Sequence, residues 1–191
     1  LLENVRFHKA ETDNDPAFAK ALAHGADVFV MDAFGTAHRA HASTAGVAAH
    51  VPVSVAGFCL KKEIDYFDKV MTSPTRPVVA IMGGAKVSDK LGVIDNLIKR
   101  MDKVIIGGGM MFTFLKAMGY EIGSSIVEME SLDTARTIMT HAREKGVKFY
   151  LPVDCVVANR VSPDAEIKIV PVQEIPAGWA GLDIGPASMR L

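Results

Sequence analysis

The feature that most constrains this chain is a pair of short apolar runs, each followed at once by glycines. The run VVAIM (78–82) precedes GGAKVSDK (83–90), and KVII (103–106) precedes GGGMM (107–111). Each glycine cluster leads into a pattern typical of an amphipathic helix, SDKLGVIDNLIKRM after the first and MFTFLKAMG after the second. Strands rich in β-branched residues that alternate with such helices predict an α/β fold, with a parallel sheet covered by helices on both faces.

The same alternation continues along the chain. We expect further strands at LLENVRF (1–7), DVFVMDAF (27–34), KFYLPVD (148–154) and AGLDIGP (180–186), and further helices at 17–24, 60–71 and 131–145. Asp15 and Pro16 are typical of a helix start, and Gly25 and Gly146 of helix ends. The segment SPTRP (73–77) ends the helix at 60–71 and is the candidate domain boundary.

Composition and charge exclude several classes of function. The net charge is −1 and the chain contains no basic run, so we expect no nucleic-acid partner. Cys59 and Cys155 lack CxxC spacing, which argues against a zinc site or a disulfide framework and favours a reducing cytoplasm. No apolar window reaches membrane-spanning length, so no membrane partner is expected either. Because the first residue is Leu1 and the sequence opens within a strand-like run, we expect an internal piece of a longer protein.

The two glycine clusters form the first candidate site. Ligands of doubly wound sheets bind at the carboxyl ends of the strands, where glycine allows close approach to the backbone. Neither cluster is a Walker A loop or a GxGxxG motif, which favours a mononucleotide lying across both strand ends. Lys86 and Lys90 could present two cations to its phosphates. Alternatively, the glycines only tighten turns and the lysines are solvated.

A second candidate site combines Arg6 and His8 with HRAH (38–41), where arginines could bind a small anionic metabolite. Two alternatives remain open. The HxxH spacing could bind a metal, although a third ligand is missing. Arg6 could instead form an ion pair with Glu3 or Asp32.

Seven segments together resemble the phosphoglycerate kinase family, in its order. They are LLENVRFH, DAFGTAHRAHAST, AGFCLKKEIDYF, RPVVAIMGGAKVSDKLGVIDNL, DKVIIGGGMMFTFLKAMGYEIGSS, LPVD and GWAGLDIGP. The resemblance implies two doubly wound, Rossmann-like parallel-sheet domains joined by a helix, both incomplete in this chain. Residues 1–56 would be part of the glycerate-binding domain, 57–77 the interdomain helix and hinge, and 78–191 part of the nucleotide-binding domain.

The resemblance also implies an activity. The family transfers the acyl phosphate of 1,3-bisphosphoglycerate to ADP, giving 3-phosphoglycerate and ATP, reversibly and with Mg2+. A cytoplasmic monomer is expected at full length, whereas the 191 residues alone are expected to be inactive, because family arginine and metal ligands lie outside them. Two rivals remain: a non-catalytic nucleotide- or anion-binding α/β module, and an NAD-dependent oxidoreductase, which the missing GxGxxG disfavours.

Matching positions carry the family's site residues over to this chain. Lys86 resembles the lysine that stabilises the transferring phosphoryl group, and Lys90 one that contacts nucleotide phosphates. Arg6 and Arg39 resemble ligands of the glycerate phosphate, with His38 beside them. The residues that resemble the walls of the adenosine site are all glycines: Gly83, Gly84, Gly108, Gly109 and Gly181. No metal ligand is assigned within the chain.

Overall fold

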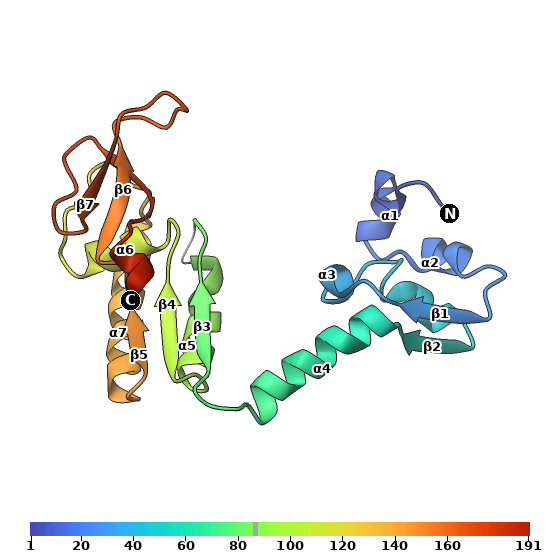
Figure 1. The fold of residues 1–191 in the computed structure, drawn as a ribbon. Coiled ribbons are helices and arrows are strands. Elements are labelled where there is room, and N and C mark those ends of the chain that lie inside the picture. The colour runs from blue at the N-terminus through green and yellow to red at the C-terminus, as the bar shows by residue number, and fades with distance from the viewer. Residues whose placement is uncertain (86–87) are drawn as a thin grey trace. The chain divides into compact units, whose positions relative to one another are not determined.

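The chain folds into two compact units, Leu1–Pro74 and Thr75–Leu191. The computed structural model describes residues 1–85 and 88–191 (Figure 1). The division between the units falls within SPTRP, the segment with the two prolines. The first unit contains one sheet and the second contains two, and each unit has its own helices.

The first unit is built around a small parallel sheet. Its elements are the 3-10 helix Val5–Phe7, α1 (Lys9–Thr12), α2 (Pro16–Leu22), β1 (Val28–Met31), α3 (Phe34–Ala37), the 3-10 helix Gly46–His50, β2 (Val53–Ala56) and α4 (Phe58–Thr72). Strands β1 and β2 pair in parallel, with Val28 opposite Val53. The expected start of α2 is confirmed, since the Asp15 carboxylate accepts a hydrogen bond from the Phe18 amide at 2.8 Å.

The carboxyl end of β1 fixes the start of α4. The Asp32 carboxylate, just after β1, accepts a hydrogen bond from the Leu60 amide at 2.9 Å. The Gly57 amide donates to the Met31 carbonyl at 2.7 Å, and a Cβ at position 57 would overlap the Asp32 side chain. Along α4, Leu60 is buried, whereas Phe67 is exposed.

The prediction of a strand at 1–7 is wrong. Residues 5–7 form a 3-10 helix, because the Asn4 side chain accepts a hydrogen bond from the Arg6 amide at 3.0 Å and turns the chain. The expected strand at 27–34 is shorter than predicted, since β1 ends at Met31 and Phe34 begins α3. Strand β2 was not expected from the sequence.

The second unit contains the larger core. Its elements are β3 (Val79–Met82), the 3-10 helix Ser88–Lys90, α5 (Leu91–Ile98), β4 (Lys103–Ile106), α6 (Met111–Ala117), the 3-10 helix Met129–Ser131, α7 (Leu132–Glu144), β5 (Lys148–Tyr150), β6 (Asp154–Ala158), β7 (Ile167–Pro171), β8 (Ala180–Ile184) and the 3-10 helix Ser188–Arg190. Helix α6 is almost wholly buried, and the Phe114 ring lies 5.4 Å from the Phe149 ring. Ile94 and Ile98 of α5 and Ile138 of α7 are also buried.

Strands of the second unit form two sheets, one parallel and one antiparallel. The first sheet has the order β3-β4-β5, and its strands are parallel, as the alternation of strands and helices predicts. Strand β6 lies between β7 and β8 and pairs antiparallel with both. The expectation that 148–154 is one strand, and that 180–186 extends the parallel pattern, is therefore wrong. Pro152, which has no amide hydrogen to donate, lies in the break between β5 and β6.

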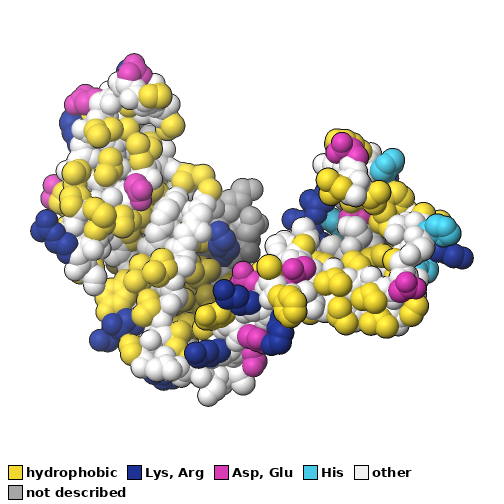
Figure 2. Space-filling model, turned by 45° about the vertical axis from the view of Figure 1, so that its right-hand side comes forward, with side chains coloured by type: hydrophobic (Ala, Val, Ile, Leu, Met, Phe, Trp, Pro, Cys, Tyr) yellow, Lys and Arg dark blue, Asp and Glu magenta, His cyan; other side chains and the backbone are white. Residues whose placement is uncertain are grey.

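Apolar side chains remain at the surface of both units, as Figure 2 shows. In the first unit, Val28 and Val53 are about half exposed, and in the second unit Ile81 of β3 is 78% exposed. A cavity of about 270 Å³ over the β3-β4-β5 sheet is lined largely by apolar residues, Ile81 and Ile105 among them. Within the described part of the chain, no helix is both long enough and apolar enough to cross a membrane.

Candidate functional site

The two glycine clusters meet at the ends of neighbouring strands. Because β3 and β4 are parallel, with Met82 opposite Ile106, the loops that follow them leave the sheet at the same edge. The Gly107 amide donates to the Met82 carbonyl at 2.8 Å, and the Met110 amide donates to the Gly84 carbonyl at 2.7 Å. The predicted convergence of these loops is confirmed.

Close contact between the two loops leaves little room for a side chain at two of these glycines, Gly108 and Gly109. Gly108 has a positive φ of +62°, and a Cβ there would lie 2.9 Å from the Gly84 amide nitrogen. A Cβ at Gly109 would lie 3.3 Å from the Ala85 Cα. Backbone therefore packs on backbone at this edge, which accounts for Gly108 and Gly109 even without a ligand.

Lys90 lies against the first glycine loop. Its Nζ donates a hydrogen bond to the Gly83 carbonyl at 2.8 Å, and a Cβ at Gly84 would overlap that ammonium. Lys90 belongs to the 3-10 helix Ser88–Lys90. Ser88 anchors the start of this helix, because its amide and hydroxyl donate to the Glu128 carboxylate at 2.9 and 2.8 Å. One of the two predicted cations thus lies at the end of β3. The other, Lys86, lies outside the described residues.

Gly181 lies close to the first turn of α6. A Cβ there would overlap the Phe112 ring, and the Gly181 amide donates to the Ser125 hydroxyl at 2.8 Å. The Phe112 amide in turn donates to the Gly109 carbonyl at 3.2 Å, which links the ring to the second glycine loop. The absence of a side chain at 181 makes room for Phe112.

Asp154, at the start of β6, is a buried polar residue that the sequence analysis did not single out. Its carboxylate accepts hydrogen bonds from the Ala187 amide at 2.9 Å and from the Ser188 amide and hydroxyl at 2.7 and 2.5 Å. Burial acts to raise the pKa of this carboxyl, but these hydrogen bonds outweigh it and hold the pKa below its usual value. The carboxylate therefore ties β6 to the start of the 3-10 helix Ser188–Arg190.

In the first unit, the two predicted arginines, Arg6 and Arg39, are exposed. Among the described residues, neither Arg6 nor Arg39 forms an ion pair or hydrogen bond through its guanidinium. The alternative partners of Arg6 are engaged elsewhere: Glu3 accepts from the Asn4 amide at 2.8 Å, and Asp32 caps α4. Both arginines can therefore bind an external anion.

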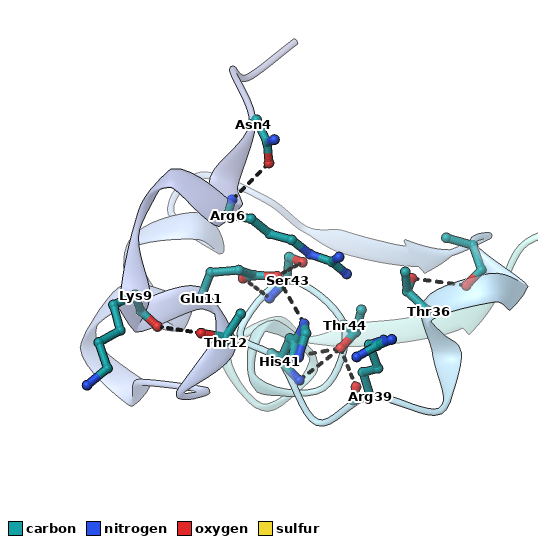
Figure 3. A network of polar contacts seen from close by, with 11 residues as sticks. Asn4, Arg6, Lys9, Glu11, Thr12, Thr36, Arg39, His41, Ser43 and Thr44 are labelled. Atoms are coloured by element: carbon teal, nitrogen blue, oxygen red, sulfur yellow. Dashed lines mark hydrogen bonds and ion pairs between the residues drawn. The ribbon is translucent and has the colours of Figure 1, made fainter. Parts of the chain in front are cut away.

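The loop that carries Arg39 is held by a network of polar contacts (Figure 3). The Thr44 hydroxyl donates to the Arg39 carbonyl at 2.6 Å, and the His41 amide donates to the Thr44 hydroxyl at 3.1 Å. The His41 Nδ1 lies 3.9 Å from a carboxylate oxygen of the buried Glu11. In the view of Figure 3, the Arg6 and Arg39 guanidinium groups both lie on the side of the network away from α1.

Histidines of the HRAH segment do not share one site. His38 is exposed at the end of α3, whereas His41 is largely buried and faces Glu11. Across residues 1–85 and 88–191, no group of three or more His, Cys, Asp or Glu side chains is arranged to hold a metal ion. Glu11, which the sequence pattern did not single out, lies at the centre of this network, and nothing in KAET (9–12) marks it as buried.

The fold and these strand ends define an α/β protein with parallel sheets whose loops converge at the carboxyl edge. The family model described as "Phosphoglycerate kinase" matches residues 1–191, and the chain belongs to the phosphoglycerate kinase family. A phosphoglycerate kinase of Geobacter metallireducens is 58% identical over 191 residues, covering 100% of this chain and 48% of that protein. The cytosolic phosphoglycerate kinase of Nicotiana tabacum is 54% identical over 190 residues, covering 100% of this chain and 47% of that protein.

Solved structures give the same result. The phosphoglycerate kinase of Coxiella burnetii aligns with a TM-score of 0.83 and 44% identity, over 98% of this chain and 48% of that one. That of Pyrococcus horikoshii aligns with a TM-score of 0.75 and 26% identity, over 99% and 50%. The chain spans about half the length of the curated relatives it matches.

Proposed function

We propose that the whole protein is a phosphoglycerate kinase, which transfers the acyl phosphate of 1,3-bisphosphoglycerate to ADP and gives 3-phosphoglycerate and ATP, reversibly. The observation that carries the proposal is the meeting of two glycine loops at parallel strand ends, with the Lys90 ammonium over the first of them. Its occurrence in a chain that the family model matches throughout supports this reaction over other uses of the same fold.

ADP or ATP would bind in the second unit. Adenosine would lie over Gly83 and Gly84 and against Gly108 and Gly109, with Gly181 at the far wall. Lys90 would exchange its contact with the Gly83 carbonyl for a contact with nucleotide phosphates, which are stronger acceptors for an ammonium group.

The glycerate substrate would bind in the first unit, where its phosphate would meet Arg6 and Arg39, with His38 nearby. Lys86 would stabilise the phosphoryl group in flight. Phosphoryl transfer depends on positioning and on charge stabilisation of the equatorial oxygens, and fixed cations supply both.

Mg2+ would accompany the nucleotide. This ion prefers phosphate and carboxylate oxygens in octahedral geometry and usually keeps several waters. The described residues provide no cluster of three His, Cys, Asp or Glu side chains for it, so they do not fit a dedicated magnesium site. The roles assigned to this chain therefore depend on its own lysines and arginines.

The division of the whole protein would follow its two substrates. We assign 1–56 to the glycerate-binding domain, 57–77 to the connecting helix and hinge, and 78–191 to the nucleotide-binding domain, with closure between them during the reaction. A cytoplasmic monomer is proposed. The 191 residues alone would lack turnover. In isolation they would act as a non-catalytic module that binds a nucleotide or an anion.

Steady-state kinetics of three lysine variants in the whole protein test the function. Lys86→Ala should lower turnover by about a hundredfold or more, equivalent to about 3 kcal/mol, because its charge acts mainly in the transition state. Lys90→Ala should also raise the KM for ADP, since it contacts phosphates that stay on the nucleotide. Lys99→Ala, which removes an exposed lysine paired with Asp95 at 2.8 Å, should change neither.

Two results would contradict this proposal. A wild-type whole protein without phosphoglycerate kinase turnover would overturn the function. A Lys86→Ala variant within a few-fold of wild-type turnover would overturn the role of Lys86. Lys86→Arg should rescue only part of the rate, because a planar guanidinium replaces a compact ammonium.

A further inference from the structure

Glu11 is a carboxylate buried to 1% exposure in a unit whose other acidic side chains are more exposed. Its two oxygens accept from one residue: the Ser43 amide donates to Oε2 at 2.9 Å, and the Ser43 hydroxyl donates to Oε1 at 2.5 Å. The Glu11 carbonyl also accepts from the Ala42 amide at 2.9 Å. These three bonds, here called the Glu11 latch, join segments 32 residues apart.

Each side of the latch continues into one of the two arginine segments. On the first side, the Glu11 amide donates to the His8 carbonyl and the His8 amide donates to the Val5 carbonyl, both at 3.1 Å, so the latch is linked by backbone bonds to the turn that carries Arg6. On the other side, Ser43 is followed by Thr44, whose hydroxyl holds the Arg39 carbonyl at 2.6 Å. The latch therefore connects the turn that carries Arg6 to the loop that carries Arg39 (Figure 3).

The energetics favour one position of the loop. A buried carboxylate is stable only when hydrogen bonds or opposite charges compensate its lost hydration. If the Arg39 loop moved away, Glu11 would lose its Ser43 bonds and the approach of His41 together. Two free guanidinium groups that must grip one small anion benefit from such a fixed spacing, because less conformational freedom is lost on binding.

We propose that Glu11 is a positioning residue for the anion site: through Ser43, it holds the Arg39 loop at the distance from Arg6 that lets both arginines bind one phosphorylated carboxylic acid. The proposal rests on the proposed function for the identity of that ligand. Glu11 itself faces Ser43 rather than the ligand.

The test compares Glu11→Gln with a matched control, Asp13→Asn, in the whole protein. Glutamine keeps the shape of the side chain, but it removes the negative charge and replaces one of the two oxygens that accept from Ser43 with an NH2 group, so the charge-assisted bonds of the latch are lost. Asp13 is an exposed carboxylate at the end of the same helix and pairs with Lys9 at 3.7 Å, so its variant makes the same change in charge without touching the latch.

Glu11→Gln should weaken binding of 3-phosphoglycerate by about tenfold or more and raise its KM alike, while the KM for ADP and the maximal rate change by less than about twofold. Asp13→Asn should resemble the wild type in its affinity for 3-phosphoglycerate, in both KM values and in its maximal rate. A purely structural role would instead reduce the active fraction, which lowers the maximal rate and leaves both KM values unchanged.

Ser43→Ala tests the route of the effect. This variant keeps the backbone donor and loses the hydroxyl, so its effect on 3-phosphoglycerate affinity should be smaller than that of Glu11→Gln. The double variant should bind 3-phosphoglycerate within about twofold of the affinity of Glu11→Gln, because both substitutions remove the same contact. Fully additive effects would contradict a latch that acts through Ser43.

Two further outcomes separate this proposal from the proposed function. If Glu11→Gln binds 3-phosphoglycerate within about twofold of the wild type, the positioning role is wrong although the kinase assignment stands. If the wild type does not bind 3-phosphoglycerate, the proposed function fails, and titration with inorganic phosphate then decides the positioning role by the same comparison of variants. Equal phosphate affinity in Glu11→Gln and Asp13→Asn would overturn it.

Discussion

Gly108 shows how a single residue can serve the fold and the candidate site together. Its φ of +62° lies in the left-handed region, and its missing Cβ leaves room for the Gly84 backbone. Left-handed backbone costs a residue with a Cβ roughly 1–2 kcal/mol. We therefore predict that Gly108→Ala lowers the free energy of unfolding of the second unit by at least about that amount and weakens ADP binding, because the first glycine loop must shift.

Gly92 provides the control for that substitution. It lies in α5, and a Cβ there would meet nothing within 4 Å. Gly92→Ala should raise the free energy of unfolding by up to about 1 kcal/mol, because alanine is the better helix former. Urea unfolding of both variants, with an ADP titration of each, checks the pair. A Gly108→Ala variant as stable as the wild type would show that the two loops do not pack as described.

At the scale of elements, Asp154 ties β6 to the 3-10 helix Ser188–Arg190. Hydrogen bonds to Ser188 and Ala187 hold the pKa of the folded carboxyl below its usual 3.8 against the opposing effect of burial. A carboxyl with a lowered folded pKa stabilises the protein above its usual pKa, and this stabilisation is lost as the pH falls.

We therefore predict that the free energy of unfolding of the second unit falls as the pH drops below about 4, and that part of this loss disappears in Asp154→Asn. Ser188→Ala should also reduce the dependence, because it removes one of the bonds that favour the charged form. Urea unfolding of the wild type and both variants at pH 7, 4 and 3 measures this pH dependence of the free energy of unfolding. An identical pH dependence in wild type and Asp154→Asn would contradict the assignment.

The elements also show which parts of the fold are predictable from sequence. Strands β3 and β4, each bounded by glycines and followed by an amphipathic helix, carry their own local signals, as does the Asp15–Pro16 start of α2. The segment 1–7 was mispredicted because a local cap at Asn4 competes with an apolar pattern. Strand β6 was not expected, because the apolar pattern at 148–154 was taken as one strand across Pro152, and periodicity carries no information about the antiparallel pairing of β6 with β7 and β8.

The candidate site was predictable to the same extent. Glycine and lysine positions after β3 follow from strand-end geometry, and their convergence needs only a parallel sheet. Glu11 could not be found this way, because it is buried against Ser43, a contact across 32 residues between helix α1 and the loop that follows α3. Gly181 was assigned by resemblance, and its packing against Phe112 becomes visible only in three dimensions.

At the scale of the whole molecule, the chain spans about half the length of its curated relatives and exposes apolar residues on the strands of both units. Val28 and Val53 of the first sheet and Ile81 of the second are examples. Apolar surface of this kind normally packs against other elements. Measurements of substrate binding therefore belong in the whole protein.

The central claim is that the nucleotide binds at the converging loops after β3 and β4, in the second unit. Glycine-selective 15N labelling of the whole protein tests it most directly, because both candidate sites contain glycines. Titration with ADP should shift the amide signals of Gly83, Gly84, Gly108 and Gly109 and leave those of Gly35 and Gly46, which flank the Arg39 loop, unchanged. If ADP instead shifted Gly35 and Gly46 and left the four loop glycines unchanged, the account of this site would be wrong.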